Sequence, residues 1–240
     1  MQIEGSVVFV SGANRGIGRA LADAFVRAGA SRVYAGMRNP ERAGDSRVVP
    51  IKLDISDDAT VQTAASQCTD VQILVNNAGI LLAQPLIGAA DPLAVESEMR
   101  TNFFGTLHMI RAFAPILKTN GGGAIVNLLS ILSRVSMPHI GSYCASKAAL
   151  YSLTQGVRAE LARQGTLVIG VLPAFVDTDM AKRVPVPKLS PDELAETVLG
   201  ALRDGTEDVY PGAAADVATQ LQRDPKAVEK QFASMFRAPS

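Results

Sequence analysis

The chain has 240 residues, 48% hydrophobic and 19% charged, which suits a globular protein with a sizeable core in one large domain or two small ones. Basic and acidic residues balance at 23 each and no basic run stands out, which argues against a nucleic-acid-binding surface. The start lacks a secretory signal, the apolar run 167–176 is too short to span a bilayer, and two cysteines argue against a disulfide framework. We therefore expect a cytoplasmic protein with no membrane association.

A glycine-rich turn follows the first predicted strand, Val7–Val10. Apolar residues at three- and four-residue spacing then predict an amphipathic helix that ends at Gly29. Gly12 permits a tight turn, Gly16 lets the backbone approach a ligand, and Gly18 lets the helix pack closely on the strand. The helix N-terminus offers free N–H groups to an anion. The spacing is G-x-x-x-G-x-G rather than G-x-G-x-x-G, and the flanking elements favour phosphate binding over a flexible turn.

The second predicted strand, Arg32–Gly36, ends without a carboxylate. In a dinucleotide-binding fold this strand end contacts the adenosine ribose, where an acid favours NAD and a base favours NADP. Arg38, together with Arg15 of the glycine-rich turn, can hold a 2′-phosphate; the alternative is two solvated arginines. The third strand, Val48–Leu53, follows so soon that the crossover can hold little more than one helical turn.

Two asparagines stand at the end of the fourth predicted strand, Val71–Val75, which follows a helix predicted over Asp57–Gln67. Asn76 and Asn77 offer amides at the carboxyl end of that strand. We expect these amides to tie neighbouring strands together and to face a ligand.

A long helix is predicted from Asp91, followed by Pro92, to about Leu117. Asn102 falls beside its apolar stripe. A polar residue at such a place is either a satisfied interior amide or a functional group, and the sequence leaves both open. The stripe consists of Val95, Met99, Phe103, Ile110 and Phe113.

The strongest chemical signal surrounds Tyr143 and Lys147, which are four residues apart with no proline or glycine between them. On a helix this spacing places both side chains on one face. A neighbouring ammonium favours the phenolate, so the pair predicts a tyrosine that works as general acid and base. Ser130, at the end of the apolar run 124–129, could converge with Tyr143 and Lys147 on one carbonyl oxygen of a substrate. Cys144 is interpreted as an ordinary residue of this helix and not as a nucleophile, because neither histidine has a sequence relation that marks it as the catalytic base for Cys144.

Strands and helices continue to alternate to the end of the chain. A sixth strand is predicted over Leu167–Leu172, and a capping box opens a helix at Ser190. A short seventh strand near Val209–Tyr210 and a last helix from Asp224 complete the pattern. We predict one domain over residues 1–240, with a doubly wound, Rossmann-like α/β fold and a mainly parallel seven-stranded sheet with helices on both faces.

Six motifs in register resemble the short-chain dehydrogenase/reductase superfamily in its single-domain form, over about residues 5–210. The motifs are Gly12-x-x-x-Gly16-x-Gly18, Asn76-Asn-Ala-Gly79, Asn102, Ser130, Tyr143-x-x-x-Lys147 and Pro173-x-x-x-x-Thr178. The resemblance implies that Tyr143 exchanges a proton with the carbonyl or alcohol oxygen and that Ser130 binds this oxygen. It also implies that Lys147 lowers the Tyr143 pKa and holds the nicotinamide ribose, and that Asn102 positions a relay water.

The same resemblance implies a set of cofactor contacts and no metal. Arg38 would hold the 2′-phosphate, and Thr178 the nicotinamide carboxamide. Asp54 and Asn76 would lie on the adenosine side. The residues that would line the pyrophosphate are Gly12, Arg15, Gly16, Ile17 and Gly18. The remaining implied contacts are Asn14, Ile55, Ala78, Gly79, Tyr143, Lys147, Pro173 and Val176.

Three positions depart from the family pattern. Leu129 replaces a second serine before Ser130, Ala174 replaces a glycine, and the segment from Met180 to Lys188 is short, which predicts an open substrate site. The expected pocket walls are Ser130, Ser133, Met137, His139, Tyr143 and Phe175, with His139 a wall residue or solvent-facing and not a reacting group.

The resulting hypothesis is an NADP-dependent short-chain dehydrogenase that prefers NADP(H) to NAD(H) and interconverts a small carbonyl compound and an alcohol. One alternative is a 3-oxoacyl-carrier-protein reductase, which needs a basic patch for which Arg134, Lys182 and Arg183 are the candidates. The alternative from another class is a non-catalytic NADPH-sensing or scaffold module. The resemblance further implies a homotetramer or homodimer.

Overall fold

The first strand shows why helices cover both faces of the sheet. Successive side chains of a strand point to opposite faces. In the computed structural model, which describes residues 1–40, 44–182 and 184–235, strand β1 (Val7–Ser11) buries all but its first residue. Val8 and Val10 pack in one apolar cluster, with Leu21 and Val198, whereas Phe9 packs in another, with Phe113. Each face of the sheet therefore has its own core.

The strands form one seven-stranded sheet in the order β3-β2-β1-β4-β5-β6-β7, and every neighbouring pair is parallel. The strand order changes direction between β1 and β4: the chain adds β2 and β3 on one side of β1, then returns and adds β4 to β7 on the other side. Ligands bind at this switch point in folds of this kind. The other strands are β2 (Arg32–Met37), β3 (Val48–Lys52), β4 (Ile73–Asn76), β5 (Ala124–Leu128), β6 (Leu167–Val171) and β7 (Asp208–Val209). The predicted doubly wound parallel fold is confirmed.

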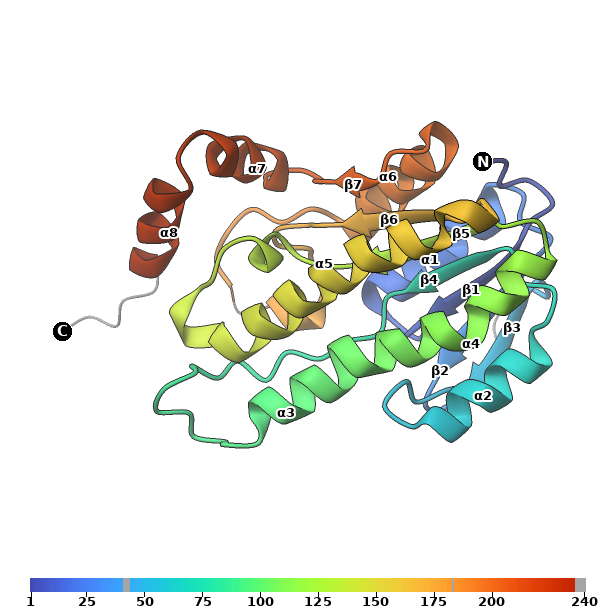
Figure 1. Cartoon of the computed structure of the whole chain (residues 1–240), viewed down its shortest axis with the longest axis horizontal. Coiled ribbons are helices and arrows are strands. Elements are labelled where there is room, and N and C mark those ends of the chain that lie inside the picture. Colours follow the sequence, from blue (N-terminus) through green and yellow to red (C-terminus); the bar gives the residue numbers. More distant parts are fainter. Residues whose placement is uncertain (41–43, 183, 236–240) are drawn as a thin grey trace.

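The helices divide between the two faces and one end of the molecule (Figure 1). Helices α1 and α6 pack against each other on one face, while α2, α4 and α5 cover the other. Helices α7 and α8 extend beyond the sheet at one end (Figure 1). The bounds are α1 (Gly16–Arg27), α2 (Asp58–Gln67), α3 (Ala94–Glu98), α4 (Thr106–Thr119), α5 (Gly141–Leu161), α6 (Pro191–Asp204), α7 (Ala214–Arg223) and α8 (Pro225–Ser234).

The predicted continuous helix from Asp91 to Leu117 is wrong in two respects. Helix α3 begins only at Ala94, with Leu93 and not Asp91 as its N-cap, and the helix is interrupted. Between α3 and α4 the chain forms a π-helical segment, Met99–Gly105, which shifts the inward face. Glu98 and Asn102 are fully buried there. The side chains expected to form the first half of the stripe (Val95, Met99, Phe103) are only half-buried. A π-bulge of this kind often marks a functional site.

Two further differences lie in the connections. The crossover between β2 and β3 contains no helix among its described residues, 38–40 and 44–47. Residues 41–43 of that predicted turn of helix lie outside the described residues. Helix α7 was not predicted, because it buries only Ala214 and Ala218 and so carries little apolar signal. Within the part of the chain that the structure describes, no helix is long and apolar enough to cross a membrane.

Candidate active site

The glycine-rich loop has the shape that the sequence predicts. Gly12 and Gly16 have φ of +69° and +54°, a backbone conformation that residues other than glycine rarely adopt. A Cβ atom at position 18 would lie 2.2 Å from the Gly12 carbonyl oxygen, which is a steric clash. Helix α1 can therefore begin this close to the loop only because residue 18 is glycine. Arg15 is the N-cap of α1 and makes no side-chain cap bond. The first N–H groups of α1 therefore have no helical or side-chain cap acceptor and can receive an anion.

The two asparagines after β4 fix this loop to its neighbours. Asn77 Nδ2 donates to the carbonyl oxygens of Ser11 and Gly12, at 2.9 and 3.2 Å. Asn76 Nδ2 donates to Asn127 Oδ1 at 2.9 Å and so joins β4 to β5. Asn76 Oδ1 is buried and has no partner among the described residues. The expectation that these amides tie adjacent strands is confirmed.

The two arginines predicted to hold a 2′-phosphate follow the carboxyl ends of β1 and β2. Arg38 is exposed directly after β2 and makes no ion pair with any described carboxylate. Its charge lies near Asp54, where hydrogen bonds from Ser56 and then this charge lower the carboxyl pKa despite partial burial. Arg15 is also exposed, and it pairs with Asp179 at 2.9 Å. These cations, the glycine loop and the uncapped helix end lie along the carboxyl ends of β1, β2 and β4, where their donors and positive charge fit the phosphates of a nicotinamide cofactor.

The four predicted catalytic side chains come together at the carboxyl ends of β4 and β5. Ser130 and Tyr143 share a side-chain hydrogen bond. Lys147 Nζ lies 5.7 Å from the Tyr143 ring centroid and donates to the Leu128 carbonyl oxygen at 2.7 Å. Asn102 lies across Gly79 from this group, since a Cβ on Gly79 would be 3.0 Å from Asn102 Oδ1 and 3.9 Å from Lys147 Nζ.

The titration of Tyr143 differs from the expectation. Burial is the largest influence and raises the Tyr143 pKa well above its ordinary value, while the hydrogen bond with Ser130 lowers it by less. Glu98 and Cys144 add to the rise. Burial also lowers the pKa of Lys147 to about 8, and its ammonium group is directed at Leu128 rather than at the phenol oxygen. Desolvation of the phenol therefore outweighs the charge of Lys147.

Asn102 owes its position to the π-helical segment. Its amide accepts from Ile80 N at 2.8 Å and donates to Ile80 O at 3.0 Å and to Ser146 Oγ at 2.9 Å. One turn earlier, Glu98 Oε1 accepts from Leu82 N at 2.7 Å. Sequence reasoning missed Glu98 and Ser146, since a glutamate in a helix and a serine beside Lys147 give no periodic signal.

The predicted pocket residues divide into enclosed and exposed side chains. Ser133 is buried, and its hydroxyl has no partner among the described residues. Phe175 and Tyr143 pack against a cluster that includes Met137 and, from α8, Phe232. His139 lies exposed in the short turn Pro138–Ile140. Helix α8 thus contributes to the surroundings of Tyr143, which no motif indicated.

The remaining predicted cofactor residues follow the same edge of the sheet. Thr178 Cγ2 lies 3.3 Å from where a Cβ on Gly16 would be, so the loop after β6 touches the glycine loop. Val176 bridges to Leu189, and Pro173 O accepts from Ile131 N. Asn14 is exposed, Ile17, Ala78 and Gly79 are half-buried, and Ile55 is buried.

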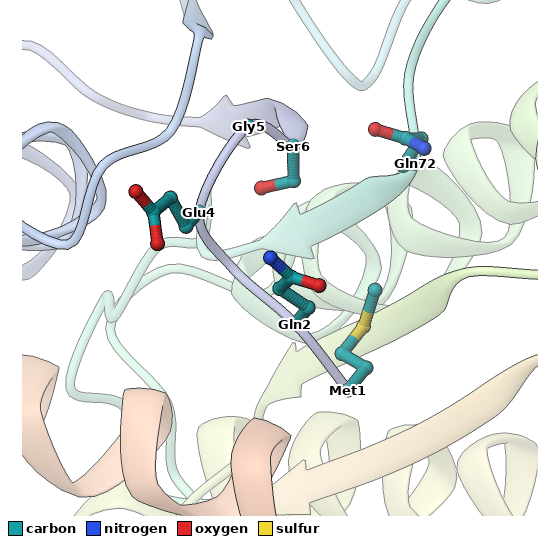
Figure 2. Close-up of a pocket in the computed structure, with 6 residues that line it drawn as sticks. All are labelled: Met1, Gln2, Glu4, Gly5, Ser6 and Gln72. Atoms are coloured by element: carbon teal, nitrogen blue, oxygen red, sulfur yellow. The ribbon is translucent and has the colours of Figure 1, made fainter.

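A separate pocket at the opposite edge of the sheet is not part of this site. It lies beside the start of β1, where Figure 2 shows Met1, Gln2, Glu4 and Gln72 around it. The catalytic group lies at the carboxyl ends of the strands. No group of three or more potential metal ligands lies together in residues 1–40, 44–182 and 184–235.

Comparison with known proteins places the chain in a family. A model of the short chain dehydrogenases matches residues 6–188. A short chain dehydrogenase from Burkholderia cenocepacia J2315, solved in complex with NADP, is 48% identical with a TM-score of 0.93, covering 97% of this chain and 99% of that one. The short chain dehydrogenase mpl6 of Monascus purpureus is 34% identical over 81% of this chain and 75% of its own length. The 3-oxoacyl-[acyl-carrier-protein] reductase FabG of Vibrio harveyi is 30% identical over 82% of each. The chain belongs to the short chain dehydrogenase family.

Proposed function

We propose that the protein is an NADPH-preferring oxidoreductase that interconverts a small ketone or aldehyde and the corresponding alcohol. The observation that carries the proposal is the group at the ends of β4 and β5: Ser130 hydrogen-bonded to Tyr143, with buried Lys147 beside the tyrosine. Acid–base chemistry on a carbonyl oxygen needs a hydrogen-bond donor that holds the oxygen, a group that transfers the proton and a nearby positive charge. These three side chains supply them.

In reduction, the Ser130 hydroxyl donates to the substrate oxygen and Tyr143 transfers its proton to that oxygen as negative charge develops. A tyrosine is protonated at neutral pH in any case, and the raised pKa of Tyr143 makes it a weaker acid that needs a nearby positive charge to release its proton. The nicotinamide, when bound, supplies or accepts the hydride. Lys147, with a pKa of about 8, is mostly charged at neutral pH and favours the phenolate that is left behind. Asn102, held by Ile80 and Ser146, positions a water that returns a proton through Lys147.

The preference for NADPH rests on Arg15 and Arg38. A 2′-phosphate can form ion pairs with both arginines, whereas a neutral 2′-hydroxyl can form an ion pair with neither. The relative from Burkholderia cenocepacia that was solved with NADP supports this choice. We expect NADPH to bind at least about tenfold tighter than NADH, and Arg38→Ala to remove about tenfold of that preference. Separate titrations with the two cofactors measure it, and an unchanged ratio in the variant refutes the assignment of Arg38.

Two alternatives are ranked lower. A reductase of acyl-carrier-protein thioesters, which the FabG relative suggests, needs free basic side chains at the site mouth. Arg134 is already engaged, donating to Tyr210 Oη at 2.7 Å and lying over the Tyr151 ring, Lys182 is exposed, and Arg183 lies outside the described residues. A sensing or scaffold module would not need the Ser130–Tyr143 hydrogen bond or a buried Lys147.

The test is a cofactor-oxidation assay over a carbonyl panel of ketones, aldehydes, diketones, quinones and 3-oxoacyl thioesters, run with NADPH and NADH separately. The proposal predicts that NADPH is consumed with at least one ketone or aldehyde. Consumption with thioesters alone would favour the acyl-carrier reductase. NADPH binding without turnover of any carbonyl would favour the sensing module.

We also propose a homodimer or homotetramer that packs through the helices bearing Asn102 and Tyr143. Leu93, at the N-cap of α3, and Phe104, within the π-helical segment, are 60% and 47% exposed. Large exposed apolar side chains on these elements support an interface there. Light scattering of the purified protein gives the mass, and a monomer at micromolar concentration would contradict the proposal.

A further inference from the structure

The ion pair between Arg15 and Asp179 is not used by the proposed cofactor site. Arg15 Nη1 lies 2.9 Å from Asp179 Oδ2. Arg15 belongs to the glycine-rich loop, and Asp179 opens the short turn Asp179–Ala181 directly after Thr178. The pair therefore joins two loops that each carry proposed cofactor contacts, although the two residues are 164 positions apart.

The contact between these loops does not depend on this pair alone. A Cβ on Gly16 would lie 3.3 Å from Thr178 Cγ2, so the loops also meet through their next residues. Both charged side chains are largely in water, with 71% of Arg15 and 69% of Asp179 exposed. An ion pair this exposed is weak and can exchange its anion. Arg15 can therefore turn from Asp179 to another acceptor without a change in the fold.

The proposed cofactor would place two anions in competition for Arg15. A 2′-phosphate that pairs with its guanidinium must displace Asp179 or share the guanidinium with it, and the two negative charges then repel each other. Arg38 faces no such competitor among the described carboxylates within ion-pair distance. NADH carries a neutral 2′-hydroxyl, so it offers Arg15 only the pyrophosphate that both cofactors share and lacks the additional anion of NADPH.

We propose that Asp179 is a specificity-determining residue that moderates the preference for NADPH by competing with the 2′-phosphate for Arg15. The inference rests on the proposed function, because it takes Arg15 as a phosphate contact. The pyrophosphate is common to both cofactors, and only NADPH adds a 2′-phosphate. Removal of the Asp179 charge should therefore strengthen NADPH binding more than NADH binding.

The experiment measures dissociation constants of NADPH and NADH for the whole chain and for Asp179→Asn. Fluorescence of the reduced nicotinamide, excited at a wavelength that protein side chains do not absorb, reports binding of both cofactors. At low ionic strength, where exposed charges act most strongly, Asp179→Asn should bind NADPH about two- to fivefold tighter, with NADH changed by less than about twofold. In an Arg15→Ala background, the same substitution should give no gain.

Asp177→Asn is the matched control, since Asp177 is 72% exposed on the same loop and pairs with Lys188 at 3.8 Å instead. It removes the same charge and should leave both dissociation constants unchanged. An equal gain in Asp177→Asn, an equal change for both cofactors, or no change in Asp179→Asn overturns the inference. If Arg15→Ala lowers NADPH affinity while Asp179→Asn does nothing, the phosphate assignment stands and only the role of Asp179 fails.

Discussion

Burial of Lys147 should make the protein less stable at neutral pH than a variant with an apolar side chain in its place. Lys147 is 5% exposed, and burial lowers its pKa from 10.5 to about 8. At about 1.4 kcal/mol for each tenfold change in the ionisation constant, this lowering of the pKa corresponds to a cost of roughly 3 kcal/mol at pH 7. Lys147→Met removes that cost. It also leaves the Leu128 carbonyl oxygen without its donor, which costs about 1–3 kcal/mol.

The expected net result at pH 7 is a variant more stable by up to about 2 kcal/mol and without reductase activity. The advantage must depend on pH. Because the pKa of Lys147 is lower in the folded than in the unfolded state, the unfolded chain binds more protons between about pH 8 and 10.5. The free energy of unfolding of the wild type therefore increases as pH rises through that window. Between pH 7 and about 9.5 the advantage of Lys147→Met should shrink by about 2 kcal/mol.

Urea unfolding followed by far-ultraviolet circular dichroism at the two pH values measures both quantities. Lys230→Met, at an exposed position of α8, is the control and should show no such pH-dependent gain. The reasoning is refuted if Lys147→Met is less stable than wild type at pH 7, or if the difference between them does not change with pH.

Three other predictions concern the loop, a helix cap and the thiols. Gly18→Ala should cost about 1–3 kcal/mol and weaken cofactor binding, since its Cβ would lie 2.2 Å from a loop carbonyl oxygen; Gly156→Ala, with open space at its Cβ, should cost nothing. Ser190→Ala should lower the free energy of unfolding by about 1 kcal/mol, because it removes the acceptor of the α6 capping box; an unchanged urea midpoint would contradict this. Cys68 and Cys144 are buried, and burial raises the pKa of Cys68 to about 12, so a thiol reagent should modify both only in denaturant; fast labelling of the native protein would count against the packing.

The parallel sheet was predictable because its strands are continuous apolar runs bounded by turns. The glycine loop and the Ser130, Tyr143 and Lys147 set were equally accessible, since spacing on one helix and position at a strand end are local properties. Local patterns also carry the capping box at Ser190, which the structure forms as predicted.

What sequence reasoning missed depends on contacts between distant segments. The π-helical turn at Asn102 is held by Ile80 and by the packing of Gly105 against Ile55, neither of which a periodicity reveals. The pairing of Arg15 with Asp179 is set by the fold that brings two loops together. The direction of the Tyr143 pKa was expected from one neighbour, whereas desolvation by the whole surrounding structure decides it.

The most direct test of the proposed function compares wild type with Tyr143→Phe, using NADPH and the best carbonyl from the panel. Phenylalanine keeps the ring and its packing but removes the hydroxyl that Ser130 contacts. A general acid contributes about 10²–10⁴-fold to turnover, so kcat should fall by at least about a hundredfold while the dissociation constant of NADPH stays within about twofold. Turnover within tenfold of wild type would show that another group is the acid and would contradict the central role given to Tyr143.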